Sequence, residues 1–93
     1  SWLKKNIKEL TNTLTAIEDL PIVQYEYKSE EGHKYIGTLA QRLLPLYPEV
    51  VAQDKDGYYS VDYGGLAAIA IQGLKELSNR VKELEEKLYG YSA

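Results

Sequence analysis

The sequence predicts an α+β fold in which small antiparallel hairpins and short helices precede one long C-terminal helix. Residues 22–28 alternate with a period of two, and residues 50–63 flank a glycine-containing turn, as paired strands do. Residues 66–88 instead repeat apolar side chains every three or four positions, as a helix does. Because 93 residues enclose only one core, we expect a single domain, with an α+β body over residues 1–65 and the helix over residues 66–89.

At the N-terminus, an amphipathic helix is predicted over residues 3–20. Apolar side chains recur there at steps of three and four, which places them on one helical face. Three threonines in the stretch lower its helix propensity, and Pro21 should end the helix. The apolar face consists of Leu3, Ile7, Leu10, Leu14, Ile17 and Leu20.

The first hairpin is predicted from "IVQYEYK" (residues 22–28), the turn "SEEG" and the returning segment "HKYIG" (residues 33–37). Val23, Tyr25 and Tyr27 lie on one side of the first strand, because successive side chains of a strand point to opposite faces. We expect this side to be half-buried.

A short helix and a second hairpin should follow. "TLAQRLLPLYP" begins like a helix that its two prolines stop, and "VVAQ" and "YYSVDY" then flank the turn "DKDG". Gly57 can take a positive φ angle in this turn without a steric penalty. Asp54 and Asp56 resemble a fragment of a calcium-binding loop, but the glycine comes two residues too early and no later glutamate lies in register. We therefore assign both aspartates to the turn and expect no metal site.

The long C-terminal helix carries the most informative pattern. Its leucines and valine alternate steps of three and four, the spacing of a coiled-coil seam, and Ala67 and Ala70 continue this register backwards. With Leu74 at heptad position a, Arg80 falls at g and Glu85 at the next e, where parallel helices pair charges across the seam. The seam residues, named here the apolar stripe, are Leu74, Leu77, Val81, Leu84 and Leu88.

Two kinds of partner could bury the apolar stripe. An isolated helix of this length is marginal in water, and each fully buried leucine contributes about 1.5–3 kcal/mol, so the stripe needs a partner. The stripe could pack on the strands of its own chain, as we expect for residues 66–71, or on the same helix of other copies. The charges that surround the stripe in residues 78–90 favour the second arrangement. Gly90 should cap the helix.

Composition and charge exclude several functions. Hydrophobic residues make up 44% and charged residues 27% of the chain, and no segment approaches the roughly 18 consecutive apolar residues of a membrane span. The net charge of -3, with lysines interleaved among glutamates, provides no basic face for nucleic acid. The lack of cysteine removes disulfides and thiolate chemistry and fits a cytoplasmic folding site. We expect no cofactor, metal, nucleic-acid or membrane partner.

The order of the motifs resembles a known family over nearly the whole chain. The most specific pieces are "IGTLAQ" (residues 36–41), "YPEVV" (residues 47–51) and "YSVDYGGL" (residues 59–66), preceded by "LKKNIKEL" (residues 3–10). The chain resembles the intramolecular chaperone auto-processing domain at the C-terminus of phage endosialidase tailspikes, other tail fibres and neck appendages. The same domain occurs in the eukaryotic myelin regulatory factor.

The resemblance implies a homotrimer held together by the helix over residues 66–89, which would form a trimeric coiled coil. The trimer would assemble the preceding fibre or tailspike segment of the same polypeptide and then release itself by serine–lysine autoproteolysis. The cut would fall at the peptide bond just before the serine. Assembly would take place in the host cytoplasm, and the mature virion fibre would lack the domain.

The catalytic pair is where the sequence departs from the family. Leu3 and Lys4 match the end of the motif, so the matching serine would precede Ser1, which falls two positions too late, and Trp2 stands where arginine is usual. Three explanations remain open: the chain was trimmed past the nucleophile, the natural terminus extends further, or the register shifts and makes Ser1 the nucleophile. A chain that starts at or after the serine has no scissile bond left. A free lysine is protonated at neutral pH, so Lys4 acts as a general base only if burial or neighbouring cations remove its proton.

Aromatic residues provide no strong alternative site. His33 is the only histidine, and we expect a surface or trimer-packing role for it rather than catalysis. The chain has nine tyrosines and no phenylalanine, which could indicate a carbohydrate surface. The periodic positions of five of them favour the core and interfaces instead: Tyr25, Tyr27, Tyr35, Tyr59 and Tyr63.

Two functions therefore remain. The first is a self-cleaving trimerisation chaperone of a phage tail fibre or tailspike. The alternative is a non-catalytic coiled-coil oligomerisation or adaptor domain. A serine–aspartate dipeptide two residues before Ser1 in the full gene, preceded by a β-rich fibre, would distinguish the first from the second.

Overall fold

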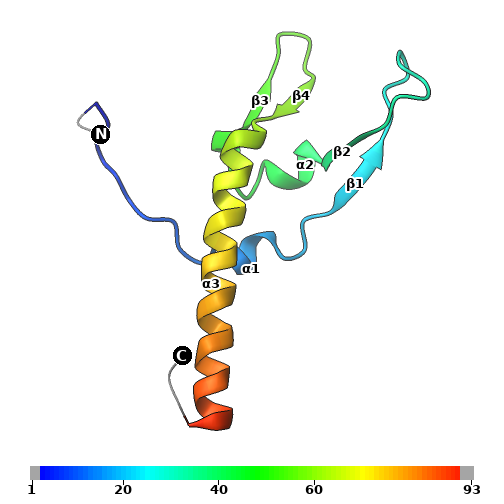
Figure 1. Ribbon diagram of the computed structural model, residues 1–93. Helices are drawn as coiled ribbons and strands as arrows, with labels where there is room; N and C mark the ends of the chain where they lie inside the picture. The colour runs from blue at the N-terminus through cyan, green and yellow to red at the C-terminus, as the bar shows by residue number, and fades with distance from the viewer. Residues whose placement is uncertain (1–2, 91–93) are drawn as a thin grey trace.

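The computed structural model describes residues 3–90, in which two β-hairpins and short helices are attached to one long helix (Figure 1). The predicted α+β class is confirmed. Both hairpins lie toward one end of the long helix, and its other half projects away from them (Figure 1). The elements are α1 (Thr13–Ile17), β1 (Ile22–Tyr25), β2 (Tyr35–Thr38), α2 (Ala40–Leu43), the 3₁₀ helix η1 (Pro48–Val50), β3 (Val51–Gln53), β4 (Tyr59–Val61) and α3 (Tyr63–Tyr89).

The long helix α3 begins and ends at defined caps. The Asp62 side chain accepts a hydrogen bond from the Gly65 N–H at 3.1 Å, so the helix starts three residues earlier than the apolar pattern predicts. At the other end Gly90 has φ +68°, and its N–H donates to the Glu86 carbonyl at 2.8 Å, as predicted for a C-terminal glycine cap. Within residues 3–90, no helix combines the length and the apolar character needed to cross a membrane.

The two hairpins form separate two-stranded antiparallel sheets. In the first, β1 pairs with β2 in the register Ile22↔Thr38 to Tyr25↔Tyr35, and Val23 and Tyr25 are half-buried as predicted. Tyr27 lies beyond the end of β1 and is 53% exposed, so its assignment to the same half-buried strand face is wrong. In the second, β3 pairs with β4 in the register Val51↔Val61 to Gln53↔Tyr59.

The turn of the second hairpin has the predicted chemistry. One carboxylate oxygen of Asp54 accepts hydrogen bonds from the Asp56 N–H at 2.8 Å and the Tyr58 N–H at 3.0 Å. Gly57 has φ +89°, in the left-handed region that side chains rarely adopt. The assignment of these aspartates to a turn is confirmed.

A small core joins the hairpin end of α3 to the rest of the body. Leu43, Val50 and Ile69 are buried, and partly buried apolar side chains surround them: Ile17, Leu20, Tyr47, Val51, Val61 and Leu66. The expectation that residues 66–71 pack on the body is confirmed for Leu66 and Ile69. The same expectation is wrong for Ile71, which is 59% exposed.

The N-terminal helix is much shorter than the sequence predicts. Of residues 3–20, only α1 (Thr13–Ile17) is helical, and Leu3 and Ile7 are exposed. Asn6 and Asn12 have φ angles of +57° and +56°, which a right-handed helix cannot contain. The apolar spacing alone therefore overestimated the helix, because the backbone at Asn6 and Asn12 interrupts it.

Replacement of Gly57 by valine should strain the second hairpin. A β-branched side chain at φ +89° should cost about 1–2 kcal/mol of stability, whereas Gly57→Asn should cost less because asparagine tolerates positive φ. Thermal unfolding followed by circular dichroism measures both variants. Equal melting temperatures for the wild type and Gly57→Val would contradict this account of the turn.

Candidate functional site

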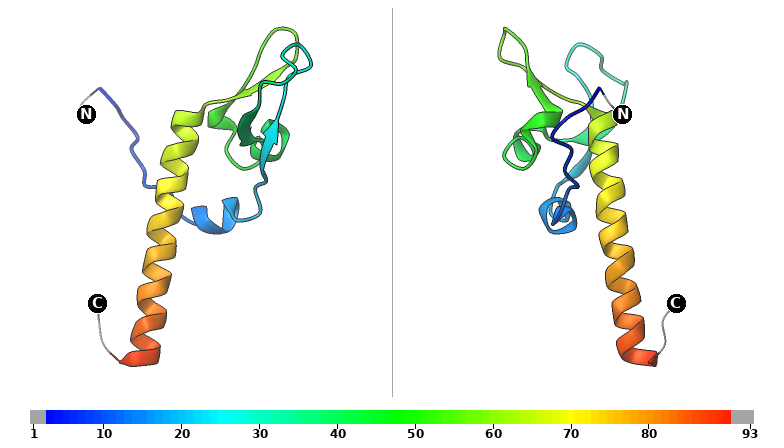
Figure 2. Two further views of the ribbon diagram at one scale, coloured as in Figure 1. Left: turned by 45° about the vertical axis from the view of Figure 1, so that its right-hand side comes forward. Right: turned by 90° about the vertical axis from the view of Figure 1, so that its left-hand side faces the viewer.

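The apolar stripe of α3 is exposed along its whole length. No buried residue of the described chain lies beyond Gly73 on this helix, and both views of Figure 2 show its C-terminal half without a neighbouring element. The stripe side chains are between 45% and 73% exposed: Leu74, Leu77, Val81, Leu84 and Leu88. The stripe therefore does not pack on the strands of its own chain, the first of the two arrangements that the sequence left open.

Heptad geometry places the predicted charges beside the stripe. Arg80 is exposed and Glu85 is half-buried, and they occupy positions g and e on the two sides of the seam. A shallow groove runs along Leu74, Leu77 and Val81 and is bordered by Glu85. This side of α3 thus combines an uncovered apolar line with charged borders.

Toward the hairpins the stripe continues into an apolar groove. Ala67 and Ala70, which extend the heptad register backwards, are exposed and lie on the wall of this groove of about 400 Å³. The rest of the wall comes from α1, the segment that follows it, β1 and the start of α3, through Ile17, Leu20, Ile22, Tyr63 and Leu66. The small alanines let another backbone approach closely at this end of α3.

A neighbouring face of α3 binds α1 through Glu76, a residue that no sequence pattern indicated. Glu76 Oε1 accepts a hydrogen bond from the Leu14 N–H at 2.8 Å, and Oε2 accepts one from the Thr13 N–H at 3.1 Å. Gln72 Nε2 donates to the same Oε2 at 3.1 Å. This arrangement, named here the Glu76 cap, joins segments more than 60 residues apart in the sequence.

The local conformation explains why α1 takes a cap from a distant element, because Asn12 lies in the left-handed region with φ +56°. The first N–H groups of a helix have no partner within it, and Asn12, at the N-cap position of α1, makes no side-chain capping bond. A carboxylate suits this position because the helix dipole is positive there. Gly73, one turn before Glu76, lets α1 approach closely: a Cβ atom there would lie 3.0 Å from Ile17 Cδ1.

The contacts of Glu76 also change its titration. The backbone hydrogen bond from Leu14, together with those from Thr13 and Gln72, holds the pKa of Glu76 below its ordinary value of 4.5, against the opposing effect of burial. The groups that hydrogen-bond to the carboxylate are neutral, and the Thr13 hydroxyl oxygen accepts a hydrogen bond from the Tyr47 hydroxyl at 3.3 Å. The carboxylate is therefore ionised at neutral pH and able to accept both N–H bonds.

The predicted catalytic pair is not assembled in the described residues. Ser1 lies outside them, and Lys4 and Lys5 are exposed in the N-terminal segment, residues 3–12, which has no helix or strand (Figure 1). The structure thus places Lys4 apart from the apolar stripe. The segment that carries Lys4 is nevertheless connected to the helix that carries the stripe, because it leads into α1 and the Glu76 cap joins α1 to α3.

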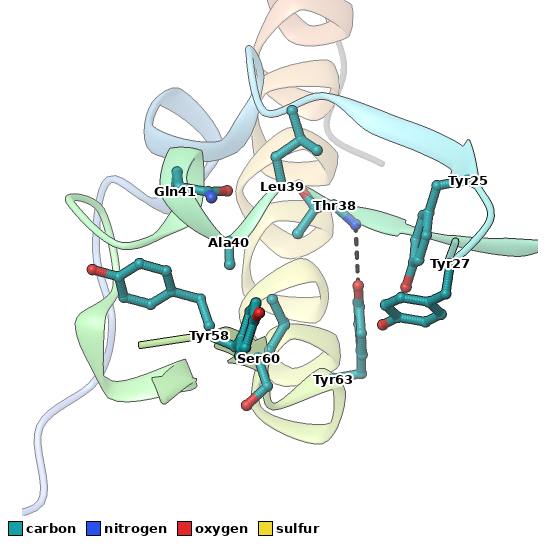
Figure 3. Close-up of a pocket in the computed structure, with 11 residues that line it drawn as sticks. Tyr25, Tyr27, Thr38, Leu39, Ala40, Gln41, Tyr58, Ser60 and Tyr63 are labelled. Carbon is teal, nitrogen blue, oxygen red and sulfur yellow. Dashed lines mark hydrogen bonds between the residues drawn. The ribbon is translucent and has the colours of Figure 1, made fainter. Parts of the chain in front are cut away.

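Tyrosines gather at a cleft of about 400 Å³ between the two hairpins (Figure 3). Figure 3 shows Tyr63, at the start of α3, with its hydroxyl accepting a hydrogen bond from the Thr38 N–H at 3.2 Å, and Tyr25 and Tyr27 beside it. A hydrogen bond with Tyr27, together with burial, raises the pKa of Tyr25 to about 12. The Tyr25 hydroxyl consequently stays protonated at neutral pH and cannot serve as a base there.

The aromatic predictions hold only in part. Tyr25 and Tyr35 are half-buried, but Tyr59 and Tyr63 are 39% and 45% exposed, so the core assignment is wrong for these two as well as for Tyr27. His33 is exposed and stacks on Tyr35 with ring centroids 4.5 Å apart, which agrees with a surface role.

These features define a small α+β domain whose long helix has one face bound to the body and one face bare, and the chain belongs to the chaperone of endosialidase family. The sequence model of that family matches residues 2–52, which confirms the resemblance inferred from the motifs. The chain is also similar to the long tail fiber protein Gp37 of Enterobacteria phage K3 and of Enterobacteria phage T2. It is 35% identical to each over 94 residues, which cover 92% of this chain but only 8% and 7% of those proteins.

Acid should weaken the Glu76 cap. Because the pKa of Glu76 is lower in the folded chain than its ordinary 4.5, the cap stabilises fully above that value and is lost as the pH falls through the folded value. Between about pH 7 and about pH 3, the wild type should lose more thermal stability than Glu76→Gln, which has no carboxylate to protonate.

Glu83→Gln is the matched control, since Glu83 occupies the same heptad position one heptad later and is exposed. Its melting temperatures, followed by circular dichroism at both pH values, should track the wild type. An equal acid loss in the wild type and Glu76→Gln would contradict the assignment.

Proposed function

We propose that this chain is a C-terminal intramolecular chaperone that trimerises, assembles the preceding segment of a phage tail fibre or tailspike, and is then released by serine–lysine autoproteolysis. The observation that carries the proposal is the bare apolar stripe on α3, whose residues are 45% to 73% exposed in the single chain. Full burial of a leucine contributes about 1.5–3 kcal/mol, so five such side chains supply a large driving force for association.

The same helix in other copies is the partner that fits the stripe best. The stripe follows heptad spacing, and Arg80 and Glu85 stand where parallel helices pair charges across a seam. Leucine and valine at the a positions do not fix the number of strands, so the number three rests on the family resemblance. Membership in the chaperone of endosialidase family and the similarity to long tail fiber proteins support a role in fibre assembly.

A trimeric module solves a physical problem of fibre folding. Three long β-rich chains must pair in register, and such pairing has a high contact order and a large loop-closure entropy. A compact domain that trimerises at one end brings the three chains together at a common starting point. Removal of the domain after assembly makes fibre assembly kinetically hard to reverse, because the unit that guides folding is gone.

For the release step, Lys4 is the proposed general base. It would take the proton from the hydroxyl of an upstream serine as that oxygen attacks the preceding carbonyl carbon, and give it to the serine nitrogen as the peptide C–N bond breaks. Water would then hydrolyse the resulting ester and free the two chain segments. We place assembly and release in the host cytoplasm. The alternative, an oligomerisation or adaptor domain without chemistry, draws its support from the exposure of Lys4 in this chain.

The first test concerns assembly. The wild-type chain should sediment as about three copies at micromolar concentration, and Leu84→Asp should dissociate it, because a carboxylate in the seam would lose its hydration. Asn79→Asp adds the same charge at heptad position f, opposite the seam, and should leave the assembly intact. A wild-type chain that sediments as a monomer would rule out the proposed function.

The second test concerns cleavage and uses a longer precursor that includes upstream residues and part of the fibre. Lys4→Ala should leave the precursor uncut but still trimeric, because the apolar stripe does not involve that amine. Lys5→Ala should still be cut, since neighbouring side chains of an extended segment point to opposite sides. Denaturing gels distinguish the outcomes. Efficient cutting of Lys4→Ala would refute the assignment, and blockage by Lys5→Ala alone would shift the dyad by one residue.

A further inference from the structure

We propose that Glu76 is a positioning residue that couples assembly to cleavage: it ties the seam helix to the N-terminal segment on which Lys4 lies. The inference rests on the proposed function and adds a mechanism to it. Burial of the apolar stripe would fix α3, the Glu76 cap would fix α1 on α3, and α1 would set the point from which the Lys4 segment starts.

Glu76 occupies a turn of α3 that also carries part of the apolar stripe. It lies between the stripe residues Leu74 and Leu77, in the same turn of the helix, but projects toward α1 rather than toward the seam. In the single chain, no stripe contact restrains this turn of α3, because Leu74 and Leu77 are exposed, and the Glu76 cap and the contact at Gly73 attach it to α1. Once copies bury Leu74 and Leu77, this turn of α3 is held in place.

Several contacts attach the start of α1 to α3. Both oxygens of Glu76 accept N–H groups from the first residues of α1, at 2.8 Å and 3.1 Å, and Gln72 braces the carboxylate from one turn earlier. The close approach at Gly73 adds van der Waals contact with Ile17. In both views of Figure 2, α1 lies against the middle of α3. The start of α1 is therefore attached to the helix that carries the seam.

The position of α1 in turn limits where Lys4 can lie. Lys4 lies nine residues before Thr13, and an extended segment of that length reaches at most about 30 Å. Asn12, with φ +56°, sets the direction in which the chain leaves α1. A fixed α1 thus confines the amine of Lys4 to a smaller volume than a detached α1 would, since a detached α1 is held only by the chain that joins it to β1. Confinement of reacting groups is what makes an intramolecular reaction fast.

The test compares Glu76→Gln with Glu83→Gln, its counterpart one heptad later. The precursor with upstream fibre residues reports cleavage on denaturing gels and mass by sedimentation, and the 93-residue chain reports hydrogen exchange at the Thr13 and Leu14 amides by NMR. Glu76→Gln should remain trimeric, exchange these amides roughly tenfold faster and cut roughly tenfold more slowly. Glu83→Gln should match the wild type in all three. Glu76→Asp, one methylene shorter, should change in the same direction as Glu76→Gln.

Other outcomes overturn the proposal. Trimeric Glu76→Gln that cuts at the wild-type rate, or that cuts slowly with unchanged amide exchange, would show that the cap does not position the segment. If the wild-type precursor never cuts, the autoproteolytic function fails, and Leu84→Asp in the 93-residue chain still tests the coupling. Faster exchange at Thr13 and Leu14 in that variant supports the link from seam to α1, and wild-type exchange refutes it.

Discussion

The helix α3 has two faces that need a partner, and the body of the chain covers only one of them. Ile69 and Gly73 are buried against the core and α1, while the apolar stripe on the other side is exposed. A single helix of 27 residues gains most of its stability from such packing. The placement of the hairpins at one end of α3, and the proposed association with further copies through the other, both follow from this division.

The contact between α1 and α3 links the two ends of the sequence. Among residues 3–90 the core contains three buried apolar side chains, so the position of the N-terminal region depends strongly on a few specific contacts. Glu76 provides two hydrogen bonds that α1 cannot obtain locally, and Gly73 provides the space for α1 to approach. The residue that carries the proposed chemistry, Lys4, is therefore connected to the proposed oligomerisation surface through one carboxylate.

Sequence patterns predicted most of the secondary structure because its signals are local. The alternation in β1, the "DKDG" turn with Gly57 and the cap at Gly90 each depend on a few neighbouring residues. The helix predicted over residues 3–20 is confirmed only within α1. Apolar spacing shows which residues would share a helical face, but it does not show whether the folded chain covers that face. The long-range role of Glu76 could not be predicted, because asparagine caps helices well and only the structure shows that the Asn12 side chain makes no capping bond.

The sequence by itself determined the fold class, the family, the heptad stripe and Lys4 as the candidate base, because periodicity and motif order are properties of the chain alone. Tertiary structure decided which face of α3 the body occupies, where α1 begins and which carboxylate caps it. These depend on contacts between residues more than 60 positions apart, such as Glu76 with Thr13 and Leu14, whose geometry no local pattern encodes. The exposure of the stripe belongs to the same group, since burial is a property of the folded surface rather than of the sequence.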